Sequence, residues 1–266
     1  MRALLLAAGL GTRLRPLTNY LPKCLVPIHG RPLLDYWLES LLNHGVSEIL
    51  INTHYLAPLV VEYLNKTEWM RQVKVVHEER LLGTAGTILK NRDFFQQETF
   101  FVAHADNLTV FDASQFAAHH ANRPAGTDLT MMAFETDVPQ SCGIVELDEH
   151  DIVRVFHEKV PSPPGNLANA AVYILEPSVI ELIESLNKEE VDFSTEVIPR
   201  LMGHIFIYRN DSYHRDIGTV TSWAEAHKDF SALPASEQNA GAWSSTLKSA
   251  DEKLLPTIAQ LLANAR

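Results

Sequence analysis

The chain has 266 residues, of which 46% are hydrophobic and 21% charged, and its formal net charge is −11. This composition is ordinary for a soluble globular protein, and the length suits one large α/β domain or a domain with a small appendage. Because a duplex nucleic-acid binder usually presents a basic surface, the acidic balance argues against long nucleic acid as a partner. The two cysteines, Cys24 and Cys142, show no metal-type or disulfide-type spacing, which favours a reducing compartment and predicts a cytoplasmic protein.

The first half of the chain alternates strand-like and helix-like segments. The apolar run over residues 3–7 predicts a strand buried on both faces, and it is too short for a membrane span and lacks the layout of a signal peptide, so no membrane contact is expected. Hydrophobic spacing then predicts a helix over 34–42, a strand over 49–52, a helix over 56–64, a strand over 73–76, a helix over 84–89 and a strand over 100–103. This alternation predicts a three-layer α/β/α, Rossmann-like fold with a mixed, mostly parallel sheet.

The second half of the chain is denser in strands. Segments 128–134, 143–147, 152–156 and 169–175 indicate a small β-rich insertion, and a helix over 179–186 and a strand over 205–208 follow. Residues 231–249 are rich in Ala and Ser, which indicates a linker or a loosely packed segment. A final amphipathic helix over 254–262 is expected to pack on the main domain; contact with a second copy, giving a homo-oligomer, is the alternative. We therefore divide the chain into a main domain over 1–230 and a linker with a C-terminal helix over 231–266.

A glycine-containing loop follows the first strand directly. In the stretch AAGLGTRLR, Gly9 and Gly11 allow a ligand to approach the backbone, consecutive N–H groups can form an anion-binding nest, and Arg13 adds fixed positive charge. The loop is neither a Rossmann G-x-G-x-x-G motif, because Leu14 stands at its third glycine, nor a Walker A loop, because Gly-Lys-Ser/Thr is absent. A tight strand-to-loop turn with solvated arginines is the alternative.

Further along, the chain resembles a known family in an ordered series of motifs. The stretches LAAGLGTRLRPLT, PKCLVPI, GRPLLDY, GVSEILI, EERLLGTAG and DIGT, together with the short motifs at 105–107, 158–159 and 169–171, are similar to those of the sugar nucleotidyltransferases, also called NDP-sugar pyrophosphorylases. The resemblance spans about residues 1–230. Each motif alone is weak, whereas the ordered set is specific.

The resemblance implies a role for each matching position. The NTP would be bound by Leu6, Ala7, Ala8, Gly9, Gly11, Thr12, Arg13, Lys23, Glu78, Gly83 and Thr84. The sugar phosphate would be bound by Gly143, Glu158, Lys159 and Asn169. The catalytic residues would be Arg13, Lys23, Asp106 and Asp216, and the two aspartates among them would hold Mg²⁺ as the cofactor.

These roles agree with the chemistry that the resemblance implies, a nucleoside monophosphate transfer from an NTP to a sugar 1-phosphate with release of pyrophosphate. The sugar phosphate is mostly dianionic near neutral pH, with a second pKa of about 6, so it needs no strong general base for in-line attack on the α-phosphorus. Cations and aligned donors address the repulsion between the anions. Taken singly, Asp106 could instead cap a segment, Asp216 could be a turn residue, and Glu158 with Lys159 could be a solvated pair.

Several positions depart from the family's pattern. A small apolar residue or proline is frequent at the position of Cys24, and a tyrosine at that of Cys142. Glycine is frequent at the positions of Ala105 and Ala171, and tryptophan at that of His214. The charged residues of the motifs are kept, and the altered positions cluster where the sugar would lie.

The base and the acceptor are less specified by the sequence. The carboxylate of Glu78 could accept two N–H groups of guanine, and the stretch HEERLLGTAG looks most like the mannose- and heptose-1-phosphate guanylyltransferases. We therefore predict GTP with a mannose- or heptose-type sugar. The alternatives are a uridylyl-, thymidylyl- or cytidylyltransferase, with another sugar 1-phosphate or phosphocholine as acceptor, and a non-catalytic sensor subunit of the same fold. Retention of the charged residues argues against the sensor.

Overall fold

The apolar run near the N-terminus forms the central strand of the protein. In the computed structural model, which describes residues 1–231 and 235–264, the side chains of Leu4 and Leu5 are fully buried. This strand pairs in parallel with a neighbour on each side, and a fourth parallel strand forms the edge of the sheet. The four strands are β1 (Arg2–Leu6), β4 (Glu48–Thr53), β5 (Val73–His77) and β6 (Phe100–His104).

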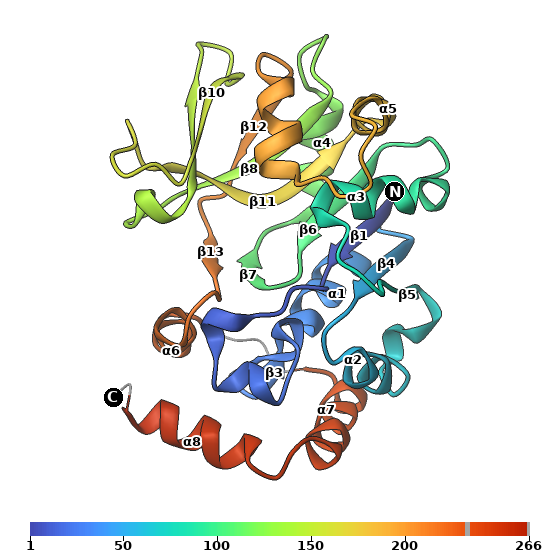
Figure 1. Cartoon of the computed structure of the whole chain (residues 1–266), viewed down its shortest axis with the longest axis vertical. Coiled ribbons are helices and arrows are strands. Elements are labelled where there is room, and N and C mark those ends of the chain that lie inside the picture. Colours follow the sequence, from blue (N-terminus) through green and yellow to red (C-terminus); the bar gives the residue numbers. More distant parts are fainter. Residues whose placement is uncertain (232–234, 265–266) are drawn as a thin grey trace.

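The strands of the second half extend the same sheet, as Figure 1 shows. Within the residues that the structure describes, this sheet contains nine strands. β11 runs antiparallel to both β6 and β8, and β12 runs parallel to β8. The β9–β10 hairpin is attached near the start of β11. The predicted mixed, mostly parallel sheet is therefore confirmed, and the later strands join it. They are β8 (Leu129–Glu135), β9 (Gly143–Leu147), β10 (Val153–Glu158), β11 (Leu167–Leu175) and β12 (Ile205–Arg209).

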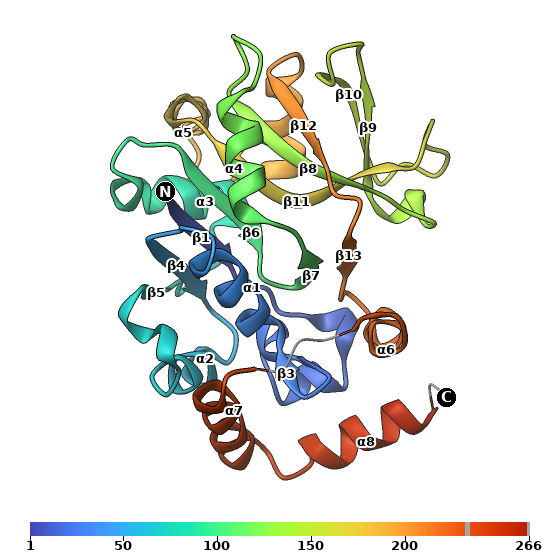
Figure 2. The same ribbon diagram turned by 180° about the vertical axis from the view of Figure 1, so that it is seen from behind.

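Helices cover both faces of the sheet, as Figures 1 and 2 show. On β1, Ala3 and Leu5 point into the cluster formed with α1, α2 and α4, whereas Leu4 points into the cluster formed with α3 and α5. This period-two alternation gives the predicted three layers, with one apolar core on each side of the sheet. The helices are α1 (Leu33–Leu42), α2 (Ala57–Leu64), α3 (Gly83–Lys90), α4 (Ala113–Ala121) and α5 (Pro177–Ser185).

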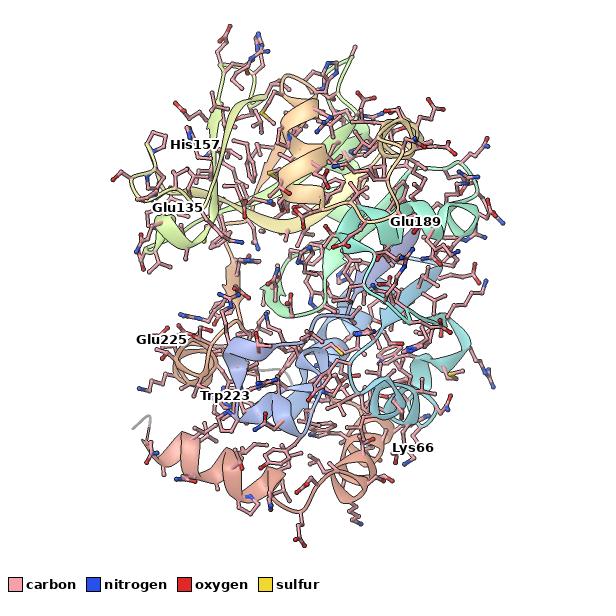
Figure 3. The ribbon with its side chains drawn as sticks, in the orientation of Figure 1. Lys66, Glu135, His157, Glu189, Trp223 and Glu225 are labelled. Carbon is pink, nitrogen blue, oxygen red and sulfur yellow. The ribbon has the colours of Figure 1, made fainter. Side chains whose placement is uncertain are left out.

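Two short ribbons lie beyond the carboxyl ends of the parallel strands. β7 (Asn107–Val110) pairs antiparallel with β13 (Tyr213–Asp216), and β2 (Pro27–Ile28) pairs with β3 (Arg31–Pro32). Helix α6 (Val220–Asp229) packs on the second ribbon, where the Trp223 indole N–H donates to the Pro27 carbonyl at 2.8 Å; Trp223 is labelled in Figure 3. Short helical turns complete the fold: η1 (Thr12–Leu14), η2 (Leu17–Asn19), η3 (Lys23–Leu25), η4 (Glu68–Arg71), η5 (Arg92–Phe95), η6 (Pro139–Ser141), η7 (Phe193–Val197) and η8 (Ile198–Leu201).

The C-terminal region differs from the sequence expectation. Its Ala- and Ser-rich composition indicated a linker, but most of this segment forms helix α7 (Glu237–Ser249). Asn239 on α7 donates to the buried carboxylate of Asp35 at 2.8 Å. Lys66, labelled in Figure 3, donates to Ser245 at 2.9 Å. Polar anchors of this kind fix a helix whose apolar face is small, which composition alone did not indicate.

The final helix, α8 (Leu254–Asn264), lies beside α7 at the end of the molecule opposite α4 and α5 (Figures 1 and 2). Leu254 is fully buried, and α8 contacts α6, whereas Leu255 remains 56% exposed. A second copy on this face stays a prediction, as does the division at residue 230. Within residues 1–231 and 235–264, every helix falls short of the length and apolar character that a membrane span requires.

Strand β11 contains an irregularity that shapes the site described below. Its pairing with β8 shifts register between Asn169 and Tyr173, and Ala171 in this bulge adopts a left-handed backbone with φ +55°. The Ala171 N–H donates to the Asn169 side-chain oxygen at 2.9 Å, which closes the bulge locally. Because a Cβ atom disfavours the left-handed region, the bulge is held at a cost in backbone strain.

Replacing Ala171 by glycine should relieve this strain. We expect Ala171→Gly to raise the free energy of unfolding by about 0.5–1 kcal/mol, since the left-handed backbone then carries no Cβ penalty. Urea denaturation gives the change through the transition midpoint. Ala170→Gly is the matched control, because its fully buried methyl group lies on backbone without positive φ, and it should lower stability. A loss of stability in both variants would contradict strain at Ala171.

Candidate active site

The candidate site lies where the parallel strands end. The carboxyl ends of β1, β4, β5 and β6 meet at one edge of the sheet, because neighbouring parallel strands share a direction. The segments that follow these strands carry the glycine loop, Glu78 and Asp106. This edge is where open α/β sheets bind ligands.

The glycine loop after β1 has a conformation that its sequence requires. Gly11 has φ +62°, and a Cβ atom there would lie 2.8 Å from the Thr18 methyl carbon. The Gly11 carbonyl accepts from the Leu14 N–H at 3.0 Å and from the Thr18 hydroxyl at 2.7 Å, so the turn is fixed from two directions. Ala7 and Ala8 are buried at the loop's start, while Arg13 on η1 is exposed. The loop thus presents its backbone and the exposed side chains of Arg13 and Arg15 to the outside of the sheet edge.

Lys23 lies between the two aspartates. Its Nζ is 2.7 Å from Asp106 Oδ2 and 3.2 Å from Asp216 Oδ1. Burial by itself lowers the pKa of Lys23, but attraction to both carboxylates outweighs it and raises the pKa above its ordinary value. Burial by itself raises the pKa of the Asp106 carboxyl. The positive charge of Lys23 outweighs this effect and holds the pKa of Asp106 below its ordinary value. Lys23 and Asp106 are therefore both charged.

Arg13 lies near the Asp216 carboxylate. A Cβ atom on Gly218 would be 2.7 Å from Asp216 Oδ2 and 3.3 Å from a terminal nitrogen of Arg13, so both side chains pack over this glycine. Asp216 ends β13 and pairs in register with Asn107 on β7, which follows Asp106 directly. The β7–β13 ribbon is what brings two aspartates that are distant in sequence to one lysine.

A cavity of about 190 Å³ joins these charges to the predicted acceptor residues. Larger hollows of about 640 and 570 Å³ lie along β5 and between the β2–β3 ribbon and α7, but they contain none of the predicted site residues. We assign the site to the smaller cavity because titratable groups of both signs converge there. The predicted residues that line it are Arg13, Lys23, Asp106, Gly143, Glu158, Lys159, Asn169 and Asp216.

The side of the cavity that carries the predicted acceptor residues is built around Gly143. A Cβ atom there would lie 2.4 Å from the Phe156 ring and 2.8 Å from Glu158 Oε2, so only glycine leaves room for both. Glu158 Oε1 pairs with the exposed ammonium of Lys159 at 2.9 Å. Asn169 is partly committed to the fold, because it accepts from Ala171 and donates to the Tyr173 hydroxyl at 2.7 Å. This wall of the cavity thus presents one carboxylate and one ammonium from adjacent residues.

The predicted base-binding residues lie outside this cavity. Glu78 is only 7% exposed and follows β5, and Gly83 opens α3 with φ +72°, where a Cβ atom would lie 2.4 Å from the Val191 carbonyl oxygen. Thr84 accepts from the Phe193 N–H at 2.7 Å, so its hydroxyl supports the fold. The structure brings Glu78 and Gly83 to the edge beside the glycine loop but does not place them with the acceptor residues.

Asn52 and Thr87 support the site but were not singled out from the sequence, whereas His214 was noted there only as a departure from the family's pattern. Asn52 at the end of β4 donates to Glu78 Oε1 at 2.9 Å, and the Thr87 hydroxyl donates to the same oxygen at 2.6 Å. His214 lines the cavity beside Phe134 and bonds Thr109 through Nδ1 at 2.8 Å. Burial lowers the pKa of His214 to about 3, which leaves a neutral imidazole. A polar residue closing an apolar strand, as Asn52 does, is a signal that the sequence contained.

Comparisons with known proteins place this chain in a family. The model of the nucleotidyl transferase family matches residues 2–232. The mannose-1-phosphate guanylyltransferase of Mycobacterium tuberculosis is 33% identical over 232 residues, which cover 85% of this chain and 64% of the relative. The chain thus spans less than two thirds of that relative's length.

Solved structures share the fold. A crystal structure from Bacillus anthracis, in complex with a sucrose, has a TM-score of 0.79 at 20% identity and covers 90% of this chain and 98% of that one. HddC from Yersinia pseudotuberculosis, complexed with GMP-PN, has a TM-score of 0.73 at 26% identity and covers 86% of this chain and 99% of that one. Together with the family model, these likenesses confirm the resemblance seen in the motifs, and the chain belongs to the nucleotidyl transferase family.

Proposed function

We propose that this protein transfers a nucleoside monophosphate from an NTP to a sugar 1-phosphate and releases pyrophosphate, with GTP and a mannose- or heptose-type sugar as substrates. The observation that carries this proposal is the cavity in which Lys23, Asp106 and Asp216 face Glu158 and Lys159. The names of relatives such as the Mycobacterium tuberculosis enzyme support the choice of GTP and mannose.

The proposed roles follow from position. The backbone of the glycine loop, with Leu6, Ala7, Ala8 and Gly9 near the base and Gly11, Thr12 and Arg13 at the phosphates, would bind the NTP. Lys159 would bind the sugar phosphate and Glu158 the sugar hydroxyls, with Gly143 and Asn169 shaping the wall. An ammonium suits a phosphate, and a carboxylate suits hydroxyl donors. Since Lys159 is exposed and Lys23 is buried, the two cations stand at different depths.

The two aspartates suit Mg²⁺. Both carboxylates already converge on one cation, the Lys23 ammonium, and hard oxygen donors are the ligands that Mg²⁺ takes. Within the part of the chain that the structure describes, no three His, Cys, Asp or Glu side chains gather into a metal cluster, so phosphate oxygens and water would complete the coordination. Bound there, Mg²⁺ would neutralise charge on the NTP phosphates.

The remaining chemistry falls to the side chains. The sugar-phosphate dianion needs no general base, so the protein's task is to hold two anions together and to stabilise the charge that moves to pyrophosphate. Lys23 and Arg13 would meet that need as cations that line the cavity, and Lys159, which lines the same cavity, would attract the phosphate of the acceptor. No nucleophilic side chain is required, so attack on the α-phosphorus proceeds in line without a covalent enzyme intermediate.

The first test crosses the four common NTPs with a panel of sugar 1-phosphates and phosphocholine in the presence of Mg²⁺. We expect pyrophosphate release with GTP and a mannose- or heptose-type sugar 1-phosphate. Turnover with a different base or acceptor would correct the substrates and keep the reaction class. Nucleotide binding without turnover by any pair would instead favour a sensor.

Replacing a proposed metal ligand should remove turnover. We expect Asp106→Asn to lower kcat by at least about 100-fold, because the neutral amide does not balance the Lys23 charge and binds a hard cation more weakly than a carboxylate does. Pyrophosphate release across a Mg²⁺ titration measures the loss, and circular dichroism checks the fold. Asp211→Asn, at an exposed position outside the cavity, is the control and should retain activity. Full activity in Asp106→Asn would exclude the metal assignment.

The acceptor assignment predicts a selective effect on KM. In Lys159→Met the aliphatic stem remains and the charge is lost, so KM for the sugar phosphate should rise about tenfold while KM for the NTP stays unchanged. Initial rates with each substrate varied in turn separate the two values. Lys188→Met, which removes an exposed lysine outside the cavity, is the matched control. Equal changes in both KM values would mean that Lys159 does not bind the sugar phosphate selectively.

A further inference from the structure

Glu78 is a buried carboxylate that forms no ion pair within the described part of the chain. Its side chain accepts from Asn52 and Thr87 on Oε1 and only from the Leu82 N–H, at 3.4 Å, on Oε2. Among residues 1–231 and 235–264, no lysine, arginine or histidine forms an ion pair with it. Burying a charge without full compensation is costly, so Oε2 is the atom that calls for a donor from a ligand.

The two donors on Oε1 are neutral and more deeply buried than Glu78 itself. Asn52 is 3% exposed and Thr87 is 1% exposed. The Thr87 hydroxyl has one proton to donate. Its 2.6 Å hydrogen bond to the Glu78 carboxylate is stronger than a 3.1 Å hydrogen bond to the Gly83 carbonyl, so the proton goes to Glu78. Thr87 therefore ties Glu78 to helix α3, and Oε1 is fully occupied.

Asn52 has a second contact that fixes its orientation. Its side-chain oxygen accepts from the Ala7 N–H at 2.8 Å, so the amide nitrogen must face Glu78. Asn52 pairs in register with Leu6 on one side and with Val76 on the other, which places it between the glycine loop and Glu78. One buried amide thus connects the backbone of the glycine loop to the carboxylate.

We propose that Asn52 and Thr87 are positioning residues that hold Glu78 Oε1 and so aim Oε2 at the base of the NTP. The ligand chemistry that fits is a base edge with adjacent N–H donors, as in guanine, and the inference rests on the proposed function. Asn52 also fixes the distance between this oxygen and the glycine loop, so that base recognition and phosphate binding share one rigid element. Selectivity then depends on two residues that touch no substrate.

The test removes the Thr87 hydroxyl and measures nucleotide selectivity by equilibrium binding, without any need for turnover. In Thr87→Val, which keeps the side-chain shape, we expect the ratio of the dissociation constants for UTP and GTP to fall at least about tenfold, because a carboxylate freed from one donor no longer has a fixed orientation. Thr87→Ser keeps the hydroxyl and should restore the ratio.

A matched control separates positioning from general damage. Thr246 is fully buried, and its hydroxyl donates to the carbonyl four residues earlier in α7 at 3.1 Å, the same distance that separates the Thr87 hydroxyl from the Gly83 carbonyl in α3, but Thr246 contacts no carboxylate. Thr246→Val should leave the selectivity ratio unchanged. An unchanged ratio in Thr87→Val, or equal weakening of both nucleotides, would overturn the proposal. Failure of the proposed function would show differently, as selective nucleotide binding by the unmodified protein without pyrophosphate release.

Discussion

The contact of the Lys23 ammonium with Asp106 and Asp216 is the constraint on which the site depends. Each partner comes from a different part of the chain, and a buried ammonium is tolerable only when carboxylates surround it. To satisfy it, β13 must pair with β7 beyond the end of β6, which draws the later part of the chain back to the first strands. The return of the chain through β13 thus completes the cluster of Lys23, Asp106 and Asp216.

Around that cluster the site separates two kinds of recognition. Charged side chains line the cavity, whereas neutral side-chain donors and backbone groups surround Glu78. This arrangement is consistent with a reaction in which phosphates must be neutralised but a base must be distinguished. Electrostatic attraction is strong but does not discriminate between ligands of the same charge. Hydrogen bonds from rigidly held groups are directional, so they can discriminate between ligands by their geometry.

Glycine and strain appear where the chain approaches itself most closely. Gly143 leaves space for Phe156 and Glu158, and Gly83 leaves space for the Val191 carbonyl oxygen, so each glycine is required by a neighbour. At Ala171 the chain instead keeps a Cβ atom in a left-handed bulge. The strain is retained in a wall of the cavity, as is common for functional sites.

The sequence by itself predicted the layered fold, the alternation of strands and helices in the first half and the charged residues that the structure gathers at one cavity, because apolar periodicity and short motifs can be recognised within single segments of the chain. It could not determine that residues 237–249 form a helix, since polar anchors such as Asn239 on Asp35 depend on a partner 204 positions away. The tertiary structure alone decided that Lys23 lies between the aspartates, that Asn169 and Thr84 support the fold, and that Asn52 and Thr87 hold Glu78. These are pairings between distant segments, and only the packing of the sheet edge brings the segments together.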